Sequence, residues 1–206
     1  MTRDVILAAG LWMPSAVMAL LAARLGRAGY SPHLFAYRGR SPFEANVEHM
    51  ARFARESPGG RATHFVGHSL GGVLVLEMLN RSPEVPVASV VLLGAPVRGC
   101  FAGRRLGQAS LGRWMMGGAC GPLWEPHSAT WKRAAPLGVI AGTVALGLGR
   151  TLGRLPGASD GVVCVEETAV DGMTAHALVG RGHSMLPVSG TVGKLVERFL
   201  GTGSFE

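Results

Sequence analysis

Serine, aspartate and histidine residues occur in an order that nucleophilic catalysis could use. Ser69 lies in the pattern Gly67-x-Ser69-x-Gly71, and Asp160 and His183 follow it along the chain. A serine hydroxyl becomes a good nucleophile when a histidine takes its proton, and that histidine needs a carboxylate to fix its tautomer and stabilise its positive charge. The order serine, acid, histidine therefore predicts acyl transfer with Ser69 as the nucleophile.

The five-residue pattern is weak evidence alone, because 31 of the 206 residues are glycine. A second match surrounds Ser159, between Gly157 and Gly161. Ser159 follows a Leu-Pro-Gly turn and precedes a run that looks extended, whereas Ser69 follows the strand-like run Thr63 to Val66 and opens a helical run. Only the surroundings of Ser69 have the strand, tight turn and helix that expose a nucleophile.

Three histidines and several acids follow Ser69. We expect His183 to be the base, because it lies in a glycine-flanked loop after the last expected strand. His176 falls inside a strand pattern, where a structural role is the better interpretation. His127 lies in an irregular stretch and would break the usual order. Asp160 is the favoured acid because an aspartate beside glycine can turn toward a neighbouring loop, although it is also an ordinary turn former. The rival acids are Glu166, Glu167 and Asp171.

The oxyanion of a tetrahedral intermediate needs two amide N–H donors. One is expected from Leu70, directly after the nucleophile, and the other from Leu11, in the loop after the first expected strand. Acyl-binding pockets are mostly apolar, so an acyl chain is expected to lie against Leu11, Trp12 and Met13 and against a later stretch rich in tryptophan.

Short runs of valine, isoleucine and leucine alternate with longer stretches of helical periodicity. That alternation predicts an α/β protein with a mostly parallel sheet of about six strands and helices on both faces. The expected strands are Val5 to Ala9, His33 to Tyr37, Ala62 to Val66, Val87 to Leu93, Leu137 to Val144 and Ala175 to Val179. The expected helices are Pro14 to Arg27, Phe43 to Arg55, Ser69 to Arg81 and Ser189 to Leu200.

Two stretches interrupt this alternation. Residues 97–135 contain Trp114, Trp124 and Trp131 and little periodicity, which indicates an insertion or cap over one end of the sheet, or tryptophans that fill a secondary core. The run from Gly147 to Gly153 lacks the GxGxxG spacing of a dinucleotide-binding loop. We expect no cofactor.

The composition predicts a globular protein without a nucleic-acid partner. Hydrophobic residues make up 48% and charged residues 16% of the chain, which suits a single domain over residues 1–206. The net charge is +7, but the basic residues are scattered and none of their runs is interleaved with aromatic residues. The positive charge would suit an acidic acyl carrier protein as a partner.

The cysteines and the N-terminus predict a cytoplasmic protein without a transmembrane segment. Cys100, Cys120 and Cys164 are odd in number and form no CxxC pair, so neither a disulfide framework nor a metal site is expected. A bridge between Cys100 and Cys120 is an alternative. The uncharged run from Val5 to Ala23 resembles a signal peptide or membrane span, but Pro14 splits it into a strand and a helix.

Six short runs are shared with one known superfamily: Gly10-Leu11-Trp12, Tyr37-Arg38-Gly39, Gly67 to Gly72, Leu92 to Pro96, Ser159 to Val163 and Gly182-His183. The sequence resembles the α/β-hydrolase superfamily over most of its length, and within it the lipase and esterase branch related to bacterial triacylglycerol lipases and GPI-inositol deacylases. The resemblance implies an ester hydrolase that uses no cofactor. Its catalytic residues would be Ser69, Asp160 and His183, with Leu11 and Leu70 as amide donors.

One position departs from that superfamily. Its members usually have histidine before the glycine of the oxyanion loop, whereas this chain has Ala9. That histidine orders the loop, so the departure predicts a less rigid oxyanion hole and a modest rate. The open alternatives are hydrolysis of acyl groups on an acyl carrier protein, and a binding protein that kept the fold and lost the chemistry.

Overall fold

A computed structural model describes residues 4–56, 62–123, 125–145 and 155–206. It contains a six-stranded sheet in the order β2-β1-β3-β4-β5-β6, and all neighbouring strands are parallel. The α/β class and the parallel sheet of about six strands are thereby confirmed. The strands are β1 (Asp4–Ala8), β2 (Ser31–Phe35), β3 (Thr63–His68), β4 (Val87–Leu93), β5 (Leu137–Gly142) and β6 (Ala175–Val179).

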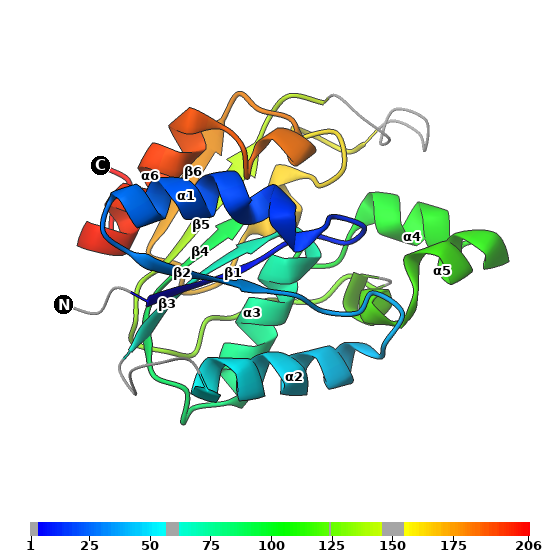
Figure 1. The fold of residues 1–206 in the computed structure, drawn as a ribbon. Coiled ribbons are helices and arrows are strands. Elements are labelled where there is room, and N and C mark those ends of the chain that lie inside the picture. Colours follow the sequence, from blue (N-terminus) through cyan, green and yellow to red (C-terminus); the bar gives the residue numbers. More distant parts are fainter. Residues whose placement is uncertain (1–3, 57–61, 124, 146–154) are drawn as a thin grey trace.

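Helices cover both faces of the sheet, as expected (Figure 1). On one face lie α1 (Ala19–Arg27) and α6 (Gly190–Thr202), and on the other lie α2 (Phe43–Glu56) and α3 (Leu70–Arg81). Successive strand side chains point to opposite faces, so β1 contributes Val5 and Leu7 to the core under α1 and α6, and Ile6 and Ala8 to the core under α2 and α3. The sheet is thus buried on both sides.

The ends of β2, β3 and β5 differ from the expected ones, because pairing with a neighbouring strand determines where each of them ends. β2 ends at Phe35 and not at Tyr37, because its partner β1 ends at Ala8, opposite Phe35. β3 continues through Gly67 to His68, since these residues pair with the end of β4. β5 ends at Gly142, where its pairing with β6 stops.

Helix starts differ in a similar way. The segment expected as a helix from Pro14 begins with a 3₁₀ turn at Ser15–Met18, and regular α-helix starts only at Ala19. Ser69 is the residue before α3 and not its first residue. The uncharged run from Val5 to Ala23 therefore folds as a strand, a turn and a helix. Over the described ranges, the structure has no helix long and apolar enough to span a bilayer.

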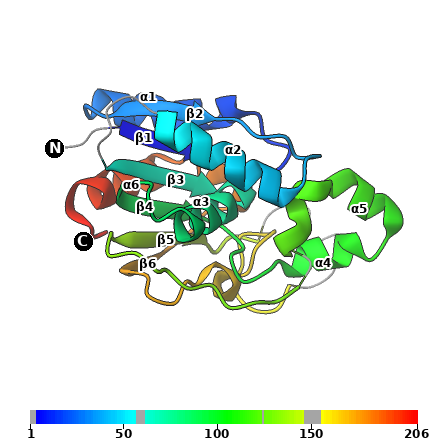
Figure 2. The same ribbon diagram turned by 90° about the horizontal axis from the view of Figure 1, so that it is seen from below.

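The stretch 97–135 contains two short helices that the sequence did not predict. They are α4 (Phe101–Gly107) and α5 (Ser110–Met116), and they project beyond the ends of the strands (Figure 2). Glycines within both helices obscure their periodicity. Trp131 is buried in the core under α3, whereas Trp114 on α5 is exposed. The assignments of this stretch as a cap and of the chain as one domain stay predictions.

Two further expectations concern the cysteines and the glycine-rich run. All three cysteines are free and buried, so a bridge between Cys100 and Cys120 is not formed. Burial raises the pKa of each of these thiols to about 12. Trp124 and the glycine-rich run from 147 to 153 lie outside the described residues.

Candidate active site

Ser69 occupies a strained turn between β3 and α3. Its φ of 54° and ψ of −128° belong to a region that residues other than glycine rarely adopt. The turn is tight enough that a Cβ on Gly67 would clash with Gly72 Cα, and a Cβ on Gly72 would clash with Ala95 Cβ, so both positions need glycine. This conformation directs the serine hydroxyl away from the backbone at the C-terminal edge of the sheet.

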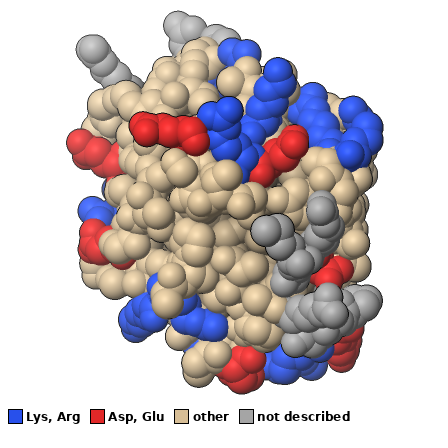
Figure 3. Space-filling view, turned by 90° about the vertical axis from the view of Figure 1, so that its left-hand side faces the viewer, with Lys and Arg blue, Asp and Glu red and all other residues tan. Residues whose placement is uncertain are grey.

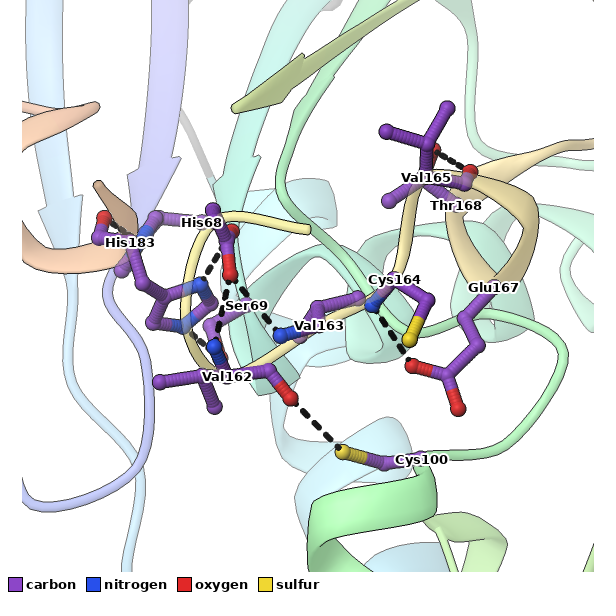
Figure 4. Close-up of polar contacts among 11 residues, drawn as sticks. His68, Ser69, Cys100, Val162, Val163, Cys164, Val165, Glu167, Thr168 and His183 are labelled. Carbon is purple, nitrogen blue, oxygen red and sulfur yellow. Dashed lines mark hydrogen bonds and ion pairs between the residues drawn. The ribbon is translucent and has the colours of Figure 1, made fainter. Parts of the chain in front are cut away.

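Ser69, His183 and Asp160 form a continuous chain of hydrogen bonds. His183 Nε2 lies 2.9 Å from Ser69 Oγ, and His183 Nδ1 lies 2.7 Å from Asp160 Oδ2. A carboxylate only accepts hydrogen bonds, so Nδ1–H donates to Asp160, and the lone pair of Nε2 accepts from the serine hydroxyl. Figure 4 shows the His183 side chain directed toward Ser69. The three residues expected from the sequence lie together.

Main-chain groups hold the acid in place. Asp160 Oδ1 accepts hydrogen bonds from the N–H groups of Val162 and Val163, at 3.0 and 2.8 Å. The carbonyl oxygen of Asp160 accepts from the N–H of His183 at 2.9 Å. Asp160 is 1% exposed, so its carboxylate faces the histidine without competition from bulk water.

The rival residues have other partners. Glu167 accepts from the N–H groups of Phe101 and Cys164, which ties the start of α4 to the acid loop, and burial raises the pKa of this carboxyl group. Asp171 forms an ion pair with Arg98. Glu166 and His127 are exposed, and the His176 ring lies beside Thr168.

The expected amide donors flank Ser69. Leu70 is the first residue of α3, and Leu11 follows Gly10 in the turn after β1. A Cβ on Gly10 would lie 2.9 Å from Ser69 Cβ and 3.4 Å from Ser69 Oγ, so this loop runs directly against the serine. Within the described residues, neither Leu11 nor Leu70 donates its N–H to a protein acceptor. Both groups therefore lack a main-chain acceptor among those residues, as an oxyanion hole would require.

His68 is a further residue of the site that the sequence did not single out. Its side chain is fully buried, and its Nε2–H donates to the main-chain carbonyl of His183 at 3.1 Å. Its Nδ1 is buried without a partner among the described residues, and it lies against Gly10. Burial, and secondly the neighbouring His183, hold the pKa of His68 well below 6.5. His68 is therefore neutral and supports the loop that carries His183.

We expect His68 to make the protein less stable in acid. Below about pH 6.5 the unfolded chain binds a proton at His68 that the folded protein excludes, so stability falls as the pH falls. His68→Gln keeps an N–H donor but does not titrate. It should reduce the pH dependence of the unfolding free energy by up to about 1.4 kcal/mol per pH unit between about pH 6.5 and pH 5. Urea unfolding at both pH values measures this, and equal slopes for the two proteins would contradict it.

A cavity of about 500 Å³ adjoins the loop after β1, residues 9–13, which we call the oxyanion loop. Leu11, Trp12 and Met13, which the sequence analysis expected beside an acyl group, line it. The stretch 97–135, which was expected beside the acyl group, contributes Met115 and Met116 to this lining. Trp12 Nε1 donates to the carbonyl of Met115 at 3.1 Å, so α5 and the oxyanion loop meet over this cavity.

The cavity is also lined by residues that the sequence did not predict. Phe35 and Tyr37 line it from the end of β2 and the segment that follows. The Tyr37 hydroxyl is buried without a partner among the described residues, and burial raises its pKa. A larger hollow of about 1420 Å³ lies beside α6 and includes none of the expected site residues. Among the described residues, no cluster of three or more His, Cys, Asp or Glu side chains could hold a metal ion.

The order of the sheet, the turn at Ser69 and the loops carrying Asp160 and His183 define an α/β-hydrolase fold. The sequence model of the alpha/beta hydrolase family matches residues 5–197, and the chain belongs to this family. The resemblance seen in the sequence is confirmed at this level. Comparison with curated protein sequences finds no match.

Three solved structures illustrate the similarity in fold. The pyrethroid hydrolase PytH is 14% identical, with a TM-score of 0.70 over 98% of both chains. The metagenomic carboxyl esterase MGS0156 is 18% identical, with a TM-score of 0.64 over 87% of this chain and 64% of that chain. The RedJ thioesterase of prodiginine biosynthesis in Streptomyces coelicolor is 15% identical, with a TM-score of 0.62 over 97% of this chain and 89% of that chain.

Proposed function

We propose that this protein is a serine carboxylic ester hydrolase that acts through an acyl-enzyme. The observation that carries the proposal is the hydrogen-bonded chain from Ser69 through His183 to Asp160. Ser69 Oγ attacks the acyl carbonyl carbon while His183 Nε2 takes its proton. His183 then protonates the leaving alcohol, and a water molecule activated by the same histidine releases the acid. Asp160 stabilises the positive charge on His183 in both steps.

The N–H groups of Leu11 and Leu70 would stabilise the oxyanion of each tetrahedral intermediate. Losing one such donor typically lowers the rate by about 100-fold or more, so the placement of Leu11 matters greatly. Gly10 supports this assignment because it brings the loop against Ser69. Ala9 is buried where the superfamily usually has the loop-ordering histidine, and we therefore expect a modest rate.

The substrate proposed here is an ester with an apolar acyl group. The cavity beside the loop after β1 supports this, because Leu11, Trp12, Met13 and Phe35 line it with apolar side chains. Gly10, which also lines it, lies against Ser69. Solved structures of similar fold include a carboxyl esterase and a pyrethroid hydrolase, which is consistent with this class of reaction.

A second candidate is hydrolysis of acyl groups held by an acidic acyl carrier protein. The RedJ thioesterase shares the fold, and the net charge of +7 would favour such a partner. Activity on carrier-bound acyl groups should then fall steeply with added salt while activity on free esters does not.

A fluorophosphonate probe tests the proposed function directly. The wild-type protein should react and gain the mass of one phosphonyl group on Ser69. Ser69→Ala should not react, because no activated hydroxyl remains. Ser159→Ala is the matched control, since Ser159 lies in the other Gly-x-Ser-x-Gly match, and it should react as the wild type does. An unreactive wild type, or labelling that survives in Ser69→Ala, would rule out the proposal.

A further inference from the structure

Helix α5 carries an apolar face that is open to solvent. Leu111, Trp114 and Met115 are 65, 61 and 48% exposed, and their spacing places them on one side of the helix. Gly112 and Met116, on the other side, are buried. Trp12, which is 56% exposed, adjoins this face through its hydrogen bond to Met115. We call these four residues, Leu111, Trp114, Met115 and Trp12, the α5 face.

Positive charge accompanies the α5 face. Residues 97–123 contain four arginines and no acidic residue. The guanidinium of Arg40 lies over the Trp114 ring, 4.7 Å from its centroid, and Arg105 is exposed on α4. The first acidic residue after this segment, Glu125, lines a hollow with Arg104 and Arg113. On the opposite side of the molecule, basic and acidic side chains both occur (Figure 3).

We propose that the α5 face docks onto an anionic phospholipid bilayer. Exposed apolar side chains with flanking arginines are suited to such a surface, where the apolar groups enter the headgroup region and the arginines meet lipid phosphates. Tryptophan is especially favoured at this depth. A second copy of the chain fits the face less well, because pairing of two such faces would bring the arginines of both together.

Docking would place the candidate active site at the lipid surface. Trp12 and Met115 belong to the α5 face and also line the cavity beside the oxyanion loop. An acyl chain leaving the bilayer at this point would therefore enter the cavity directly. The entry of lipid acyl chains into the cavity rests on the proposed function and specifies its substrates as membrane lipids. Docking itself does not require hydrolysis.

The test uses the Ser69→Ala protein, so that binding is measured without turnover. Cosedimentation with vesicles of equal parts phosphatidylglycerol and phosphatidylcholine should show binding that weakens with salt, and vesicles of pure phosphatidylcholine should bind little. Replacing both Leu111 and Trp114 with Ser should weaken binding by roughly tenfold or more. Leu178→Ser is the matched control, because Leu178 is 59% exposed on β6, at the far edge of the sheet, and it should not change binding.

Charge reversal supplies a second comparison. Arg40→Glu should weaken vesicle binding by roughly tenfold or more, since Arg40 lies over Trp114 and each basic residue near the surface contributes about fivefold. Lys194→Glu on α6 changes the net charge equally and should have a much smaller effect. In a protein that retains Ser69, the Leu111 and Trp114 double variant should not change hydrolysis of a short soluble ester.

The docking proposal would be overturned if the protein did not bind anionic vesicles or bound both vesicle types equally. It would also be overturned if the control variants lost as much vesicle binding as the test variants, or if the protein bound an acidic acyl carrier protein in place of vesicles. A dimer that the Leu111 and Trp114 substitutions dissociate, without vesicle binding, would also overturn it. The proposed esterase activity fails separately, if the protein that retains Ser69 does not hydrolyse soluble esters.

Discussion

Replacing His183 with Ala is expected to lower kcat for hydrolysis of p-nitrophenyl butyrate by about 10⁶-fold. In the proposed mechanism, His183 Nε2, 2.9 Å from Ser69 Oγ, takes the serine proton, and without it the serine stays a neutral hydroxyl. KM should change little, because His183 does not contribute to the cavity that would hold the acyl group. Initial rates measured against substrate concentration separate the two parameters.

Two controls make this experiment specific. His176→Ala and His127→Ala remove the other histidines that follow Ser69, and both should retain activity because their rings lie beside Thr168 and Glu125. Adding Ser69→Ala to His183→Ala should lower kcat little further, since residues that act as a unit are not additive. A loss of less than about tenfold in His183→Ala would contradict the mechanism.

Asp160→Asn is expected to lower kcat by about 10⁴-fold. The amide oxygen of asparagine can still accept from the N–H groups of Val162 and Val163, so the loop should keep its shape. The amide nitrogen then faces His183 Nδ1, which must accept a hydrogen bond instead of donating one. The proton moves to Nε2, and the histidine can no longer accept the proton of Ser69.

Asp171→Asn is the matched control for this substitution. Asp171 was a rival for the acid, and the structure pairs it with Arg98. It should keep nearly full activity, and thermal unfolding should show whether either variant has lost stability. Full activity in Asp160→Asn, or a comparable loss in Asp171→Asn, would show that the acid has been assigned wrongly.

Much of this fold could be predicted because its signals are local. Buried parallel strands appear as short runs of valine, isoleucine and leucine, and the helices between them have clear periodicity. The ends of β2 and β3 could not be predicted, because they depend on where partner strands stop. Helices α4 and α5 were missed because Gly103, Gly107 and Gly112 weaken a pattern that spans only two turns in each.

Some features of the candidate site could likewise be predicted from the sequence, and others could not. The order of Ser69, Asp160 and His183 is visible in the sequence because each lies after an expected strand. The contact of His68 with the His183 carbonyl joins residues 115 positions apart, and no local pattern indicates it. Met115 and Met116 reach the cavity only because α5 folds back over the oxyanion loop, which depends on the tertiary arrangement.

The main-chain contacts of Asp160 have a consequence for engineering. Its side chain is held by the N–H groups of Val162 and Val163, and its carbonyl by the N–H of His183. Any residue except proline supplies such an N–H group. A library of substitutions at Val162, which is partly exposed, can therefore vary the surface beside the acid without moving the carboxylate relative to the histidine. The hydrogen bonds that orient Asp160 thus do not depend on the side chain at position 162.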